Sequence, residues 1–300
     1  MSATLLVMAA GLATRYGGNK QIEPVGPYGG LLFEYAIYDA IKAGFNRVVF
    51  VIRESMYAYF NQRIKSKIDT NIEVLFAFQE FYTLPGNYIP SVMRIKPYGT
   101  VHAVYCAKDV IDGSFIVINA DDYYGETTYR SLYQAMISLH ATGEAVMAVY
   151  KLKNTLSING DVTRGLCNIN PNRTLHRITE TYHIKGNQRG DIYSYNPLVG
   201  DRRLDPETPV SMNVWGFTPW IFNEIGSALV AFLEHLDPHD LQAEFPLPIA
   251  IDSLLQSGRL DVHTVENDET WYGITYPDDI HDVRAALLKK HLYGTYPEHL

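Results

Sequence analysis

The stretch Leu5-Leu6-Val7-Met8, which runs on into Ala9-Ala10-Gly11-Leu12-Ala13-Thr14-Arg15-Tyr16-Gly17-Gly18-Asn19-Lys20-Gln21, decides the fold expected for this chain of 300 residues. A short apolar run that ends in a glycine-containing segment is typical of a buried strand of a parallel sheet. Residues 9–21 are therefore expected to form the loop at the carboxyl end of that strand. Its small residues allow close backbone approach to a ligand, and its two cations, five positions apart, are suited to holding phosphates.

Strand and helix patterns alternate outward from this stretch. Residues 31–43 have a helical apolar pattern that stops at Gly44, residues 47–52 are a β-branched strand, residues 54–67 are helical, and residues 72–78 form a third strand. The order β, α, β, α, β predicts an α/β fold with a doubly wound, mostly parallel, Rossmann-like sheet.

The remaining chain is less regular and becomes rich in strands after residue 150. Helices are expected at 101–110, 128–140, 220–236, 248–257 and 278–291, and strands at 115–119, 145–150, 165–170, 175–184, 211–217 and 260–265. We expect one domain over residues 1–300, with a β-rich second half and C-terminal helices.

Composition excludes several classes of function. A net charge of −8 argues against a general nucleic-acid binder, because such proteins need a broad basic surface. Cys106 and Cys167 are far apart and lack CxxC spacing, so neither a disulfide framework nor a thiolate zinc site is expected. The first apolar run stops at Gly11 and has no basic residues before it, so no signal peptide or membrane contact is expected and cytoplasmic residence is the default.

Two places lie beyond the carboxyl ends of predicted strands, where open α/β sheets bind ligands. The first is the loop of residues 9–21, which is neither GxGxxG nor a Walker loop because Lys20 precedes Gln21 and the glycine spacing differs. The second is Asp121-Asp122, just past the strand that ends at Asn119. Capping of the next helix or turn is the alternative role for this acidic pair.

Four blocks in this order resemble the sugar-phosphate nucleotidyltransferases, the NDP-sugar pyrophosphorylases, and most of all UTP–glucose-1-phosphate uridylyltransferase-like proteins. They are Gly11-Leu12-Ala13-Thr14-Arg15 followed by Lys20-Gln21-Ile22-Glu23-Pro24-Val25, Phe76-Ala77-Phe78-Gln79, Gly99-Thr100-Val101-His102-Ala103-Val104, and Val117-Ile118-Asn119-Ala120-Asp121-Asp122-Tyr123-Tyr124-Gly125. The resemblance covers about the first 150 residues well. It implies a nucleotide-binding half at 1–150, a sugar-binding half at 151–235 and a C-terminal strand and helices at 236–300, in a GT-A type fold.

The resemblance also implies an activity and a set of site residues. The activity is transfer of a nucleotidyl group from an NTP, with UTP slightly favoured, to a sugar 1-phosphate, with Mg²⁺ and release of pyrophosphate. The implied residues are Arg15 and Lys20 for catalysis; Ala10, Gly11, Thr14, Gln79, Gly99 and Thr100 for the nucleotide; Gly165, Asn168 and Glu180 for the sugar phosphate; and Asp121 for the metal. Asp122 is expected to point away, since adjacent side chains leave a strand on opposite faces. His102 is expected to be structural.

The physical chemistry of the reaction requires the same kinds of groups, namely cations and a divalent ion. Two phosphate-bearing molecules repel one another, so cations and a divalent ion must neutralise their charge. Holding both in line supplies roughly 7–11 kcal/mol, more than the roughly 3–4 kcal/mol of one electrostatic donor. Arg15, Lys20 and an Asp121-bound Mg²⁺ would suffice without a nucleophilic side chain.

Two features depart from the family pattern. Gly273 stands where much of the family has a second metal-binding Asp, and Asp278 and Asp279 are expected to begin the last helix instead. Glu180 precedes Thr181 rather than the Lys of a Glu-Lys-Pro motif, which leaves the sugar open. Two alternatives therefore remain, a GT-A type glycosyltransferase that uses a nucleotide sugar and a non-catalytic nucleotide or sugar-phosphate sensor. The oligomeric state is also open.

Overall fold

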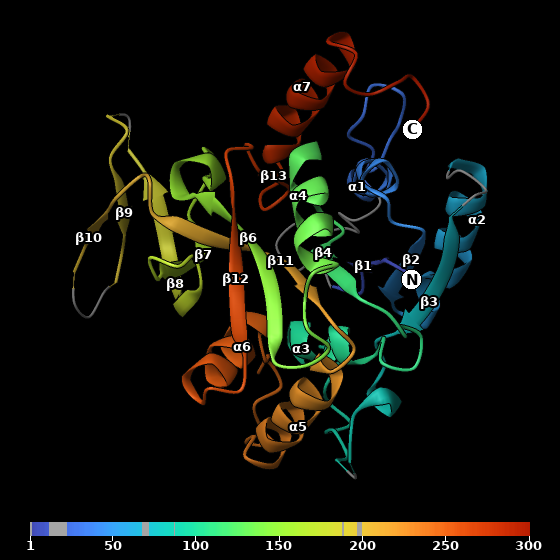
Figure 1. Ribbon diagram of the computed structural model, residues 1–300, viewed down its shortest axis with the longest axis vertical. Coiled ribbons are helices and arrows are strands. Elements are labelled where there is room, and N and C mark those ends of the chain that lie inside the picture. Colours follow the sequence, from blue (N-terminus) through green and yellow to red (C-terminus); the bar gives the residue numbers. More distant parts are fainter. Residues whose placement is uncertain (1, 12–22, 68–71, 87, 188, 197–199) are drawn as a thin grey trace.

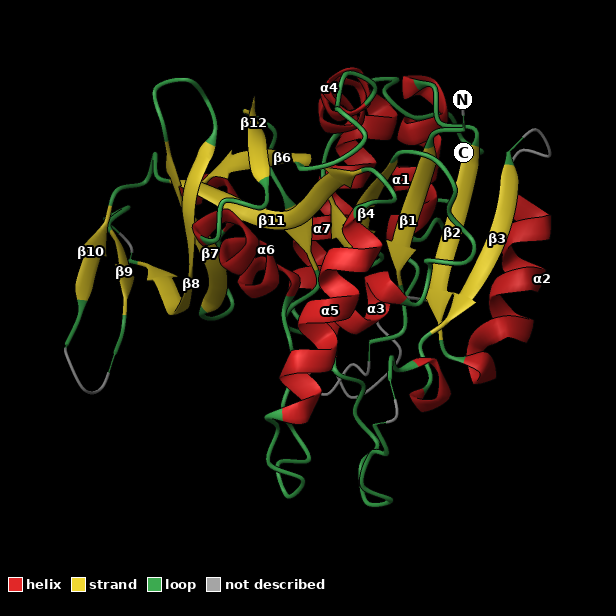
Figure 2. Ribbon diagram, turned by 60° about the horizontal axis from the view of Figure 1, so that its bottom comes forward, coloured by secondary structure: helices red, strands yellow, loops and turns green. Residues whose placement is uncertain are grey.

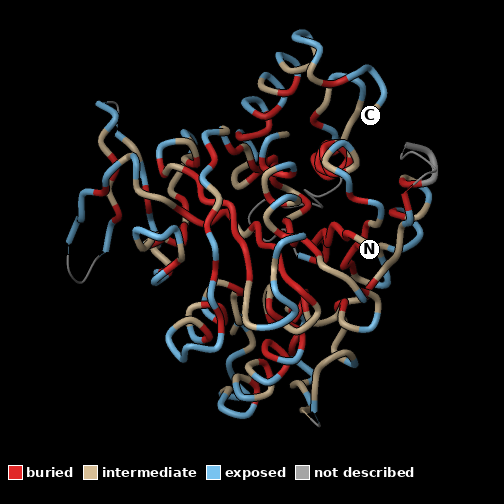
Figure 3. Tube along the Cα trace, in the orientation of Figure 1, coloured by how far each residue is buried: buried red, intermediate tan, exposed pale blue. Residues whose placement is uncertain are grey.

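The computed structural model describes residues 2–11, 23–67, 72–86, 88–187, 189–196 and 200–300. In these ranges eleven strands form one continuous sheet, with helices packed against both of its faces (Figures 1 and 2). The α/β, doubly wound architecture expected from the sequence is confirmed. Figure 3 shows buried residues concentrated along the central strands.

Four parallel strands form the first half of the sheet, in the order β4-β1-β2-β3. They are β1 (Thr4–Met8), β2 (Arg47–Ile52), β3 (Glu73–Phe78) and β4 (Phe115–Asn119). Met8 pairs with Val51 and Asn119, and Ile52 pairs with Phe78, so the carboxyl ends of all four strands lie at one edge. The segments that follow them are therefore brought together.

Alternating side chains of these strands pack into two separate hydrophobic cores, one on each face of the sheet. On one face Leu5 and Val7 pack with α1 (Leu32–Ala43), α2 (Tyr57–Lys67) and α4 (Glu126–Met136). On the other face Leu6 and Met8 pack with α3 (Gly99–Tyr105), α5 (Ile221–Glu234) and α6 (Leu247–Gln256). The period-two alternation of a strand thus explains why both faces of the sheet carry helices. Helix α1 ends at Gly44, whose φ of 111° is the left-handed cap that the sequence predicted.

The second half extends the sheet with antiparallel strands. These are β6 (Glu144–Lys151), β7 (Val162–Ile169), β8 (Leu175–Gly186), β9 (Ile192–Ser194), β10 (Arg202–Leu204) and β11 (Pro209–Phe217). Strand β11 pairs with β4, β6 and β7, and the order then continues through β8 to β9 and β10 at the left edge of Figure 1. Strand β12 (Asp261–Asn267) pairs parallel to β6. Because β11 joins the two halves, it lies at the centre of the molecule.

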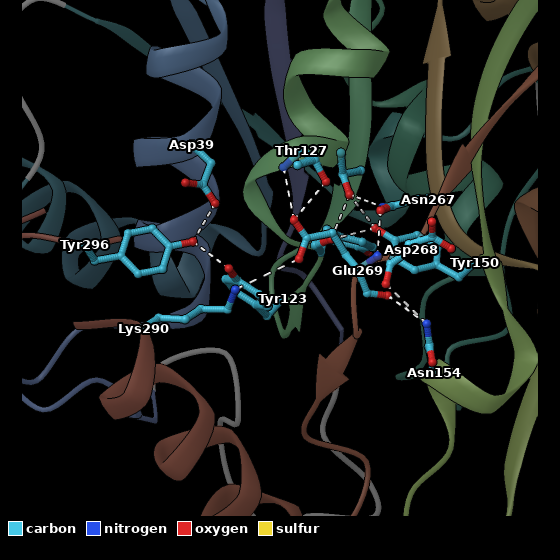
Figure 4. A network of polar contacts seen from close by, with 12 residues as sticks. Asp39, Tyr123, Thr127, Tyr150, Asn154, Asn267, Asp268, Glu269, Lys290 and Tyr296 are labelled. Atoms are coloured by element: carbon cyan, nitrogen blue, oxygen red, sulfur yellow. Dashed lines mark hydrogen bonds and ion pairs between the residues drawn. The ribbon is translucent and has the colours of Figure 1, made fainter. Parts of the chain in front are cut away.

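Two very short strands and the last helix complete the fold. Strand β5 (Asp122–Tyr123) pairs with β13 (Tyr272–Gly273), and α7 (Asp279–Leu292) follows. Figure 4 shows how the C-terminal segment is fastened: the Tyr296 hydroxyl donates to Asp39 Oδ2 at 2.7 Å and lies 2.7 Å from the Tyr123 hydroxyl. This network ties β5 to α1 and to the C-terminal segment.

Sequence patterns placed the long elements well and missed the short ones. Strands of two or three residues, namely β5, β9, β10 and β13, were not predicted, because so few residues show no periodicity. Single turns of 3₁₀ helix at Glu54–Met56, Phe81–Thr83 and Leu152–Thr155 were also not singled out. Helix α3 ends at Tyr105 rather than at residue 110. Among the described helices, none combines the length and the apolar character that a membrane crossing requires.

Candidate functional site

A first cavity of about 330 Å³ opens at the carboxyl edge of the parallel strands. Its volume lies at the lower end of the range of about 300–1,000 Å³ that small-molecule sites occupy. The described residues that line it are Met8, Ala10, Gly11, Gln79, Lys96, Pro97, Gly99, Thr100, Ala103, Asn119, Asp121, Glu244 and Pro246. They come from the ends of β1, β3 and β4 and the segments just after them, from α3 and the loop before it, and from the segment before α6.

Hydrogen bonds between side chains and backbone fix the segments that surround the first cavity. Gln79 Nε2 donates to the Gly99 carbonyl at 3.0 Å, which ties the end of β3 to the start of α3. Gly99 has a φ of 84°, and a Cβ there would lie 2.8 Å from the Phe245 backbone. Only glycine allows this close approach without strain. The Thr100 hydroxyl accepts a bond from Leu247 N at 2.7 Å, so α3 and α6 begin at one point.

A second cavity of about 300 Å³ adjoins the first. The two share Thr100, Asn119, Asp121 and Pro246 as lining residues. The other residues of the second cavity are Asp122, Thr163, Arg164, Gly165, Glu180, Ser211, Met212, Asn213, Pro248, Trp271 and Thr275. Asp121 therefore stands where the two cavities meet.

Asp122 lines the second cavity as well, so the expectation that it points away from the site is wrong. The alternation argument fails because β4 ends at Asn119, and Asp122 begins the separate strand β5. Asp122 Oδ2 accepts hydrogen bonds from Asn119 Nδ2 at 2.8 Å and from the Tyr124 hydroxyl at 3.1 Å. These bonds fix the carboxylate beside the cavity.

A chain of amide side chains supports that carboxylate. Asn213 Nδ2 donates to Asn119 Oδ1 at 3.0 Å, and Trp215 Nε1 donates to Asn213 Oδ1 at 3.2 Å. Asn213 has a φ of 60°, and it lies where the pairing of β11 with β6 shifts register between Ser211 and Trp215. Left-handed residues other than glycine are uncommon and concentrate at functional sites. Asn213 lines the second cavity, although no role was assigned to it from the sequence.

Gly273 has no room for a side chain. A Cβ at this position would lie 2.1 Å from Trp271 Cζ2 and 2.7 Å from Asp122 Oδ1. Asp122 in β5 pairs directly with Gly273 in β13. The Asp122 carboxylate therefore lies next to the position from which a side chain at residue 273 would extend. Asp279 is occupied elsewhere, since its Oδ2 accepts the backbone N–H groups of Thr275 and Tyr276 at the start of α7. The predicted role of Asp279 at the start of the helix is thus confirmed.

Buried charged groups distinguish the second cavity. Arg164 is 8% exposed, and its guanidinium lies 4.6 Å from the ring centroid of Trp271. Glu180 has one carboxylate oxygen, Oε2, that is buried and has no hydrogen-bond partner among the described residues. Burial raises the pKa of Glu180, and the charge of Arg164 opposes this shift.

The structure brings most of the predicted site residues together. Ala10, Gly11, Gln79, Gly99 and Thr100 line the first cavity, Gly165 and Glu180 line the second, and Asp121 and Thr100 line both. Thr14, Arg15 and Lys20 lie outside the described residues.

Two other predicted positions lie away from the cavities. Asn168 is exposed and lines neither cavity, because it lies three residues beyond Gly165, the last residue of β7 that reaches the second cavity. Its assignment to the sugar phosphate has no support in the geometry. His102 is fully buried beneath the first cavity, with its Nε2 3.1 Å from the Thr83 hydroxyl, and burial lowers its pKa to about 4. It has the structural role that was expected.

A family model described as nucleotidyl transferase matches residues 6–180. This range includes most of β1 and all of β3, β4 and β7, the strands that contribute residues to the two cavities. The chain belongs to the nucleotidyl transferase family. A search of curated protein sequences found no match.

Solved structures share the fold of this nucleotidyl transferase over nearly its whole length. An inositol-1-phosphate CTP transferase from T. maritima is 14% identical with a TM-score of 0.61, covering 96% of this chain and 97% of that one. A putative glucose-1-phosphate thymidylyltransferase from Bacillus anthracis is 13% identical with a TM-score of 0.62, covering 96% of both chains. A UDP-glucose pyrophosphorylase complexed with UDP-glucose is 16% identical with a TM-score of 0.61, covering 97% and 100%. At these identities the likeness concerns the fold.

Proposed function

We propose that this nucleotidyl transferase joins an NTP to a sugar 1-phosphate and releases pyrophosphate. The observation that carries the proposal is the place of Asp121, at the junction of two adjacent cavities. The first cavity is walled by the small residues and backbone of the nucleotide blocks, and the second by buried charged and amide side chains. An enzyme that joins two phosphate-bearing molecules needs a charge-neutralising centre between two such sites.

The acidic residues suit the Mg²⁺ that this reaction needs. Magnesium prefers oxygen ligands, and proteins commonly hold it through one or two carboxylates together with substrate phosphates. Asp121 and Asp122 both line the second cavity. The Asp122 carboxylate occupies part of the space that a side chain at residue 273 would need. These two carboxylates would hold the ion, which supplies positive charge to phosphate oxygens during an in-line displacement.

The chain's own residues then perform the binding and alignment. Gln79, Gly99 and Thr100 shape the first cavity for the base and sugar of the NTP. Glu180 would accept hydrogen bonds from hydroxyl groups of the acceptor, and its buried oxygen without a partner among the described residues supports this role. Arg15 and Lys20, assigned from the sequence, would neutralise the triphosphate. Alignment of the two substrates is the largest expected contribution, roughly 7–11 kcal/mol.

Pyrophosphate release tests the proposal directly. Purified protein is incubated with Mg²⁺, each of the four common NTPs and a panel of sugar 1-phosphates, and pyrophosphate and nucleotide sugar are both quantified. We expect equal amounts of the two products in at least one mixture, with UTP as the first donor to try. Tight NTP binding without turnover would identify a sensor instead. Sugar transfer from a nucleotide sugar without pyrophosphate would identify a glycosyltransferase.

A further inference from the structure

Arg164 is a buried cation on the wall of the second cavity that has no carboxylate bound to it in the described part of the chain. Its Nε and Nη2 donate to the Thr155 carbonyl, and its Nη1 donates to the Thr163 carbonyl at 2.8 Å. A guanidinium has five N–H donors, so these three bonds do not exhaust it. Its face lies against the ring of Trp271.

Two of the carboxylates whose charge acts on Arg164, those of Asp279 and Asp122, are hydrogen-bonded to other groups. Asp279 accepts bonds from Ser157 at 2.6 Å and Asn159 at 2.8 Å, besides the two backbone N–H groups of the last helix. Asp122 is held by Asn119 and Tyr124. Burial lowers the pKa of Arg164 to about 10, against the opposing charges of Asp122, Glu180 and Asp279. The guanidinium therefore remains charged at neutral pH.

A buried charge without a counter-ion is costly, because desolvation of the ion is not repaid by a close partner. Arg164 is also the one cation among the described residues that line the second cavity. Residue 181, which follows Glu180 on β8, is threonine instead of the lysine of a Glu-Lys-Pro motif. No lysine side chain therefore reaches the cavity from this position. An anion bound in the cavity would give the guanidinium the direct partner that these carboxylates, bound to other groups, do not supply.

We propose that Arg164 binds the phosphate group of the acceptor sugar 1-phosphate and sets the affinity for it. This inference rests on the proposed function and deepens it. The planar guanidinium is suited to a phosphate because two parallel N–H groups can meet two oxygens. Glu180 on the neighbouring strand would meet the hydroxyl groups of the same molecule. The two side chains thus recognise the two ends of a phosphorylated sugar.

A purely structural role is the competing explanation. The bonds from Arg164 to Thr155 and Thr163 link the Leu152–Thr155 turn to β7, and this link needs N–H groups but no charge. Arg164→Gln keeps an N–H donor and an aliphatic stem but removes the charge. Arg164→Lys keeps the charge but loses the fork. Arg177→Gln is a matched control, since Arg177 is an exposed arginine on β8.

The experiment measures KM for glucose 1-phosphate and for UTP with Mg²⁺ in the wild type and the three variants. Hydrogen bonds to charged groups are worth about 1.5–3 kcal/mol, so Arg164→Gln should raise KM for glucose 1-phosphate about 10- to 100-fold. KM for UTP should stay within about twofold, since Arg164 does not line the first cavity. Arg164→Lys should lie between the wild type and Arg164→Gln, and Arg177→Gln should match the wild type.

Direct binding keeps this inference separate from the proposed function. Inorganic phosphate and glucose 1-phosphate are titrated calorimetrically into the wild type and each variant, with circular dichroism to verify folding. If no mixture of substrates releases pyrophosphate, the proposed function fails, yet weaker phosphate binding by Arg164→Gln still supports the role of Arg164. Equal binding by wild type and variant, or no phosphate binding by the wild type, overturns it. If Arg164→Gln does not fold, Arg164→Lys decides, because unchanged phosphate affinity without the fork contradicts the proposal.

Discussion

The two cavities that meet at Asp121 are built on opposite principles. The first is lined mainly by small residues and backbone at the ends of parallel strands, and its described charged pair, Lys96 and Glu244, is mutually neutralised at 3.1 Å. The second is lined by buried charges and amides, some with unsatisfied atoms. The two cavities have similar volumes, but the lining of the first suits recognition by shape and that of the second suits recognition by charge.

This contrast predicts how substitutions will act. A change in the first cavity should alter the fit of one ligand by modest amounts, since each neutral contact contributes little. A change among the carboxylates between the cavities should affect both substrates at once. The following predictions test that division.

The largest effect is expected for Asp121→Ala. Because this residue lines both cavities, its loss should lower kcat by about 10²- to 10³-fold, which is what one electrostatic group contributes at such sites. Steady-state kinetics with both substrates varied would measure this effect. Asp109→Ala, at an exposed acid beside Lys108, is the control and should leave the rate unchanged. A full rate in Asp121→Ala would show that the junction between the cavities is not the reaction centre.

A smaller but clear effect is expected for Gly273→Ala. The added Cβ would overlap the Trp271 ring and approach the Asp122 carboxylate, so overpacking should cost about 1–3 kcal/mol in the free energy of unfolding. Displacement of Asp122 should also lower activity. Urea unfolding and kinetics measure the two effects. Gly186→Ala is the matched control, because its Cβ would meet the end of the Leu156 side chain at 3.3 Å and the Asp191 carbonyl oxygen at 4.0 Å. Equal stability of the two variants would contradict the close packing around Gly273.

Gln79→Ala probes recognition by shape in the first cavity. It removes the hydrogen bond to the Gly99 carbonyl, and a net value of about 0.5–1.5 kcal/mol for one such bond corresponds to a rise of about 2- to 10-fold in KM for the NTP. KM for the sugar 1-phosphate should not change, because Gln79 does not line the second cavity. Comparison of the two KM values checks this. A rise in both KM values would show that the two cavities do not bind the two substrates separately.

The smallest effect on either cavity is expected for Asp39→Asn, in the network of Figure 4. Burial raises the pKa of Asp39 from its ordinary value of 3.8 to about 7. The folded state therefore keeps a proton that the unfolded chain releases, so this contribution to stability is full below about pH 4 and is lost as pH rises through about 7. Asp39→Asn should remove that pH dependence with little change in kinetics.

Urea unfolding from pH 4 to 8 measures the Asp39 contribution. Asp282→Asn, at an exposed acid on α7, should leave the pH profile as in the wild type. A profile of Asp39→Asn that matches the wild type would show that another group sets the dependence. A large change in kcat would show that the C-terminal network positions Asp122 through the adjoining Tyr123.

The first cavity was predictable from the sequence to a large extent. Ala10, Gln79 and Asp121 follow apolar runs directly, and parallel strands bring their carboxyl ends to one edge. The same reasoning failed for Asp122, because a two-residue strand interrupts the alternation that it relied on. Asn168 lies outside both cavities, because only Thr163, Arg164 and Gly165 of β7 line the second one and a sequence pattern does not show where along a strand a cavity ends.

The sequence by itself determined the alternation of strands and helices, the edge of the sheet at which the first cavity lies, and the family. These properties depend on local periodicity and on motifs within single segments. Only the tertiary structure decided that Arg164 lies buried against Trp271 and that Asp122 occupies the space beside Gly273. Burial of a charge depends on neighbours more than 100 residues away, and no local pattern records which distant groups will remove it from water.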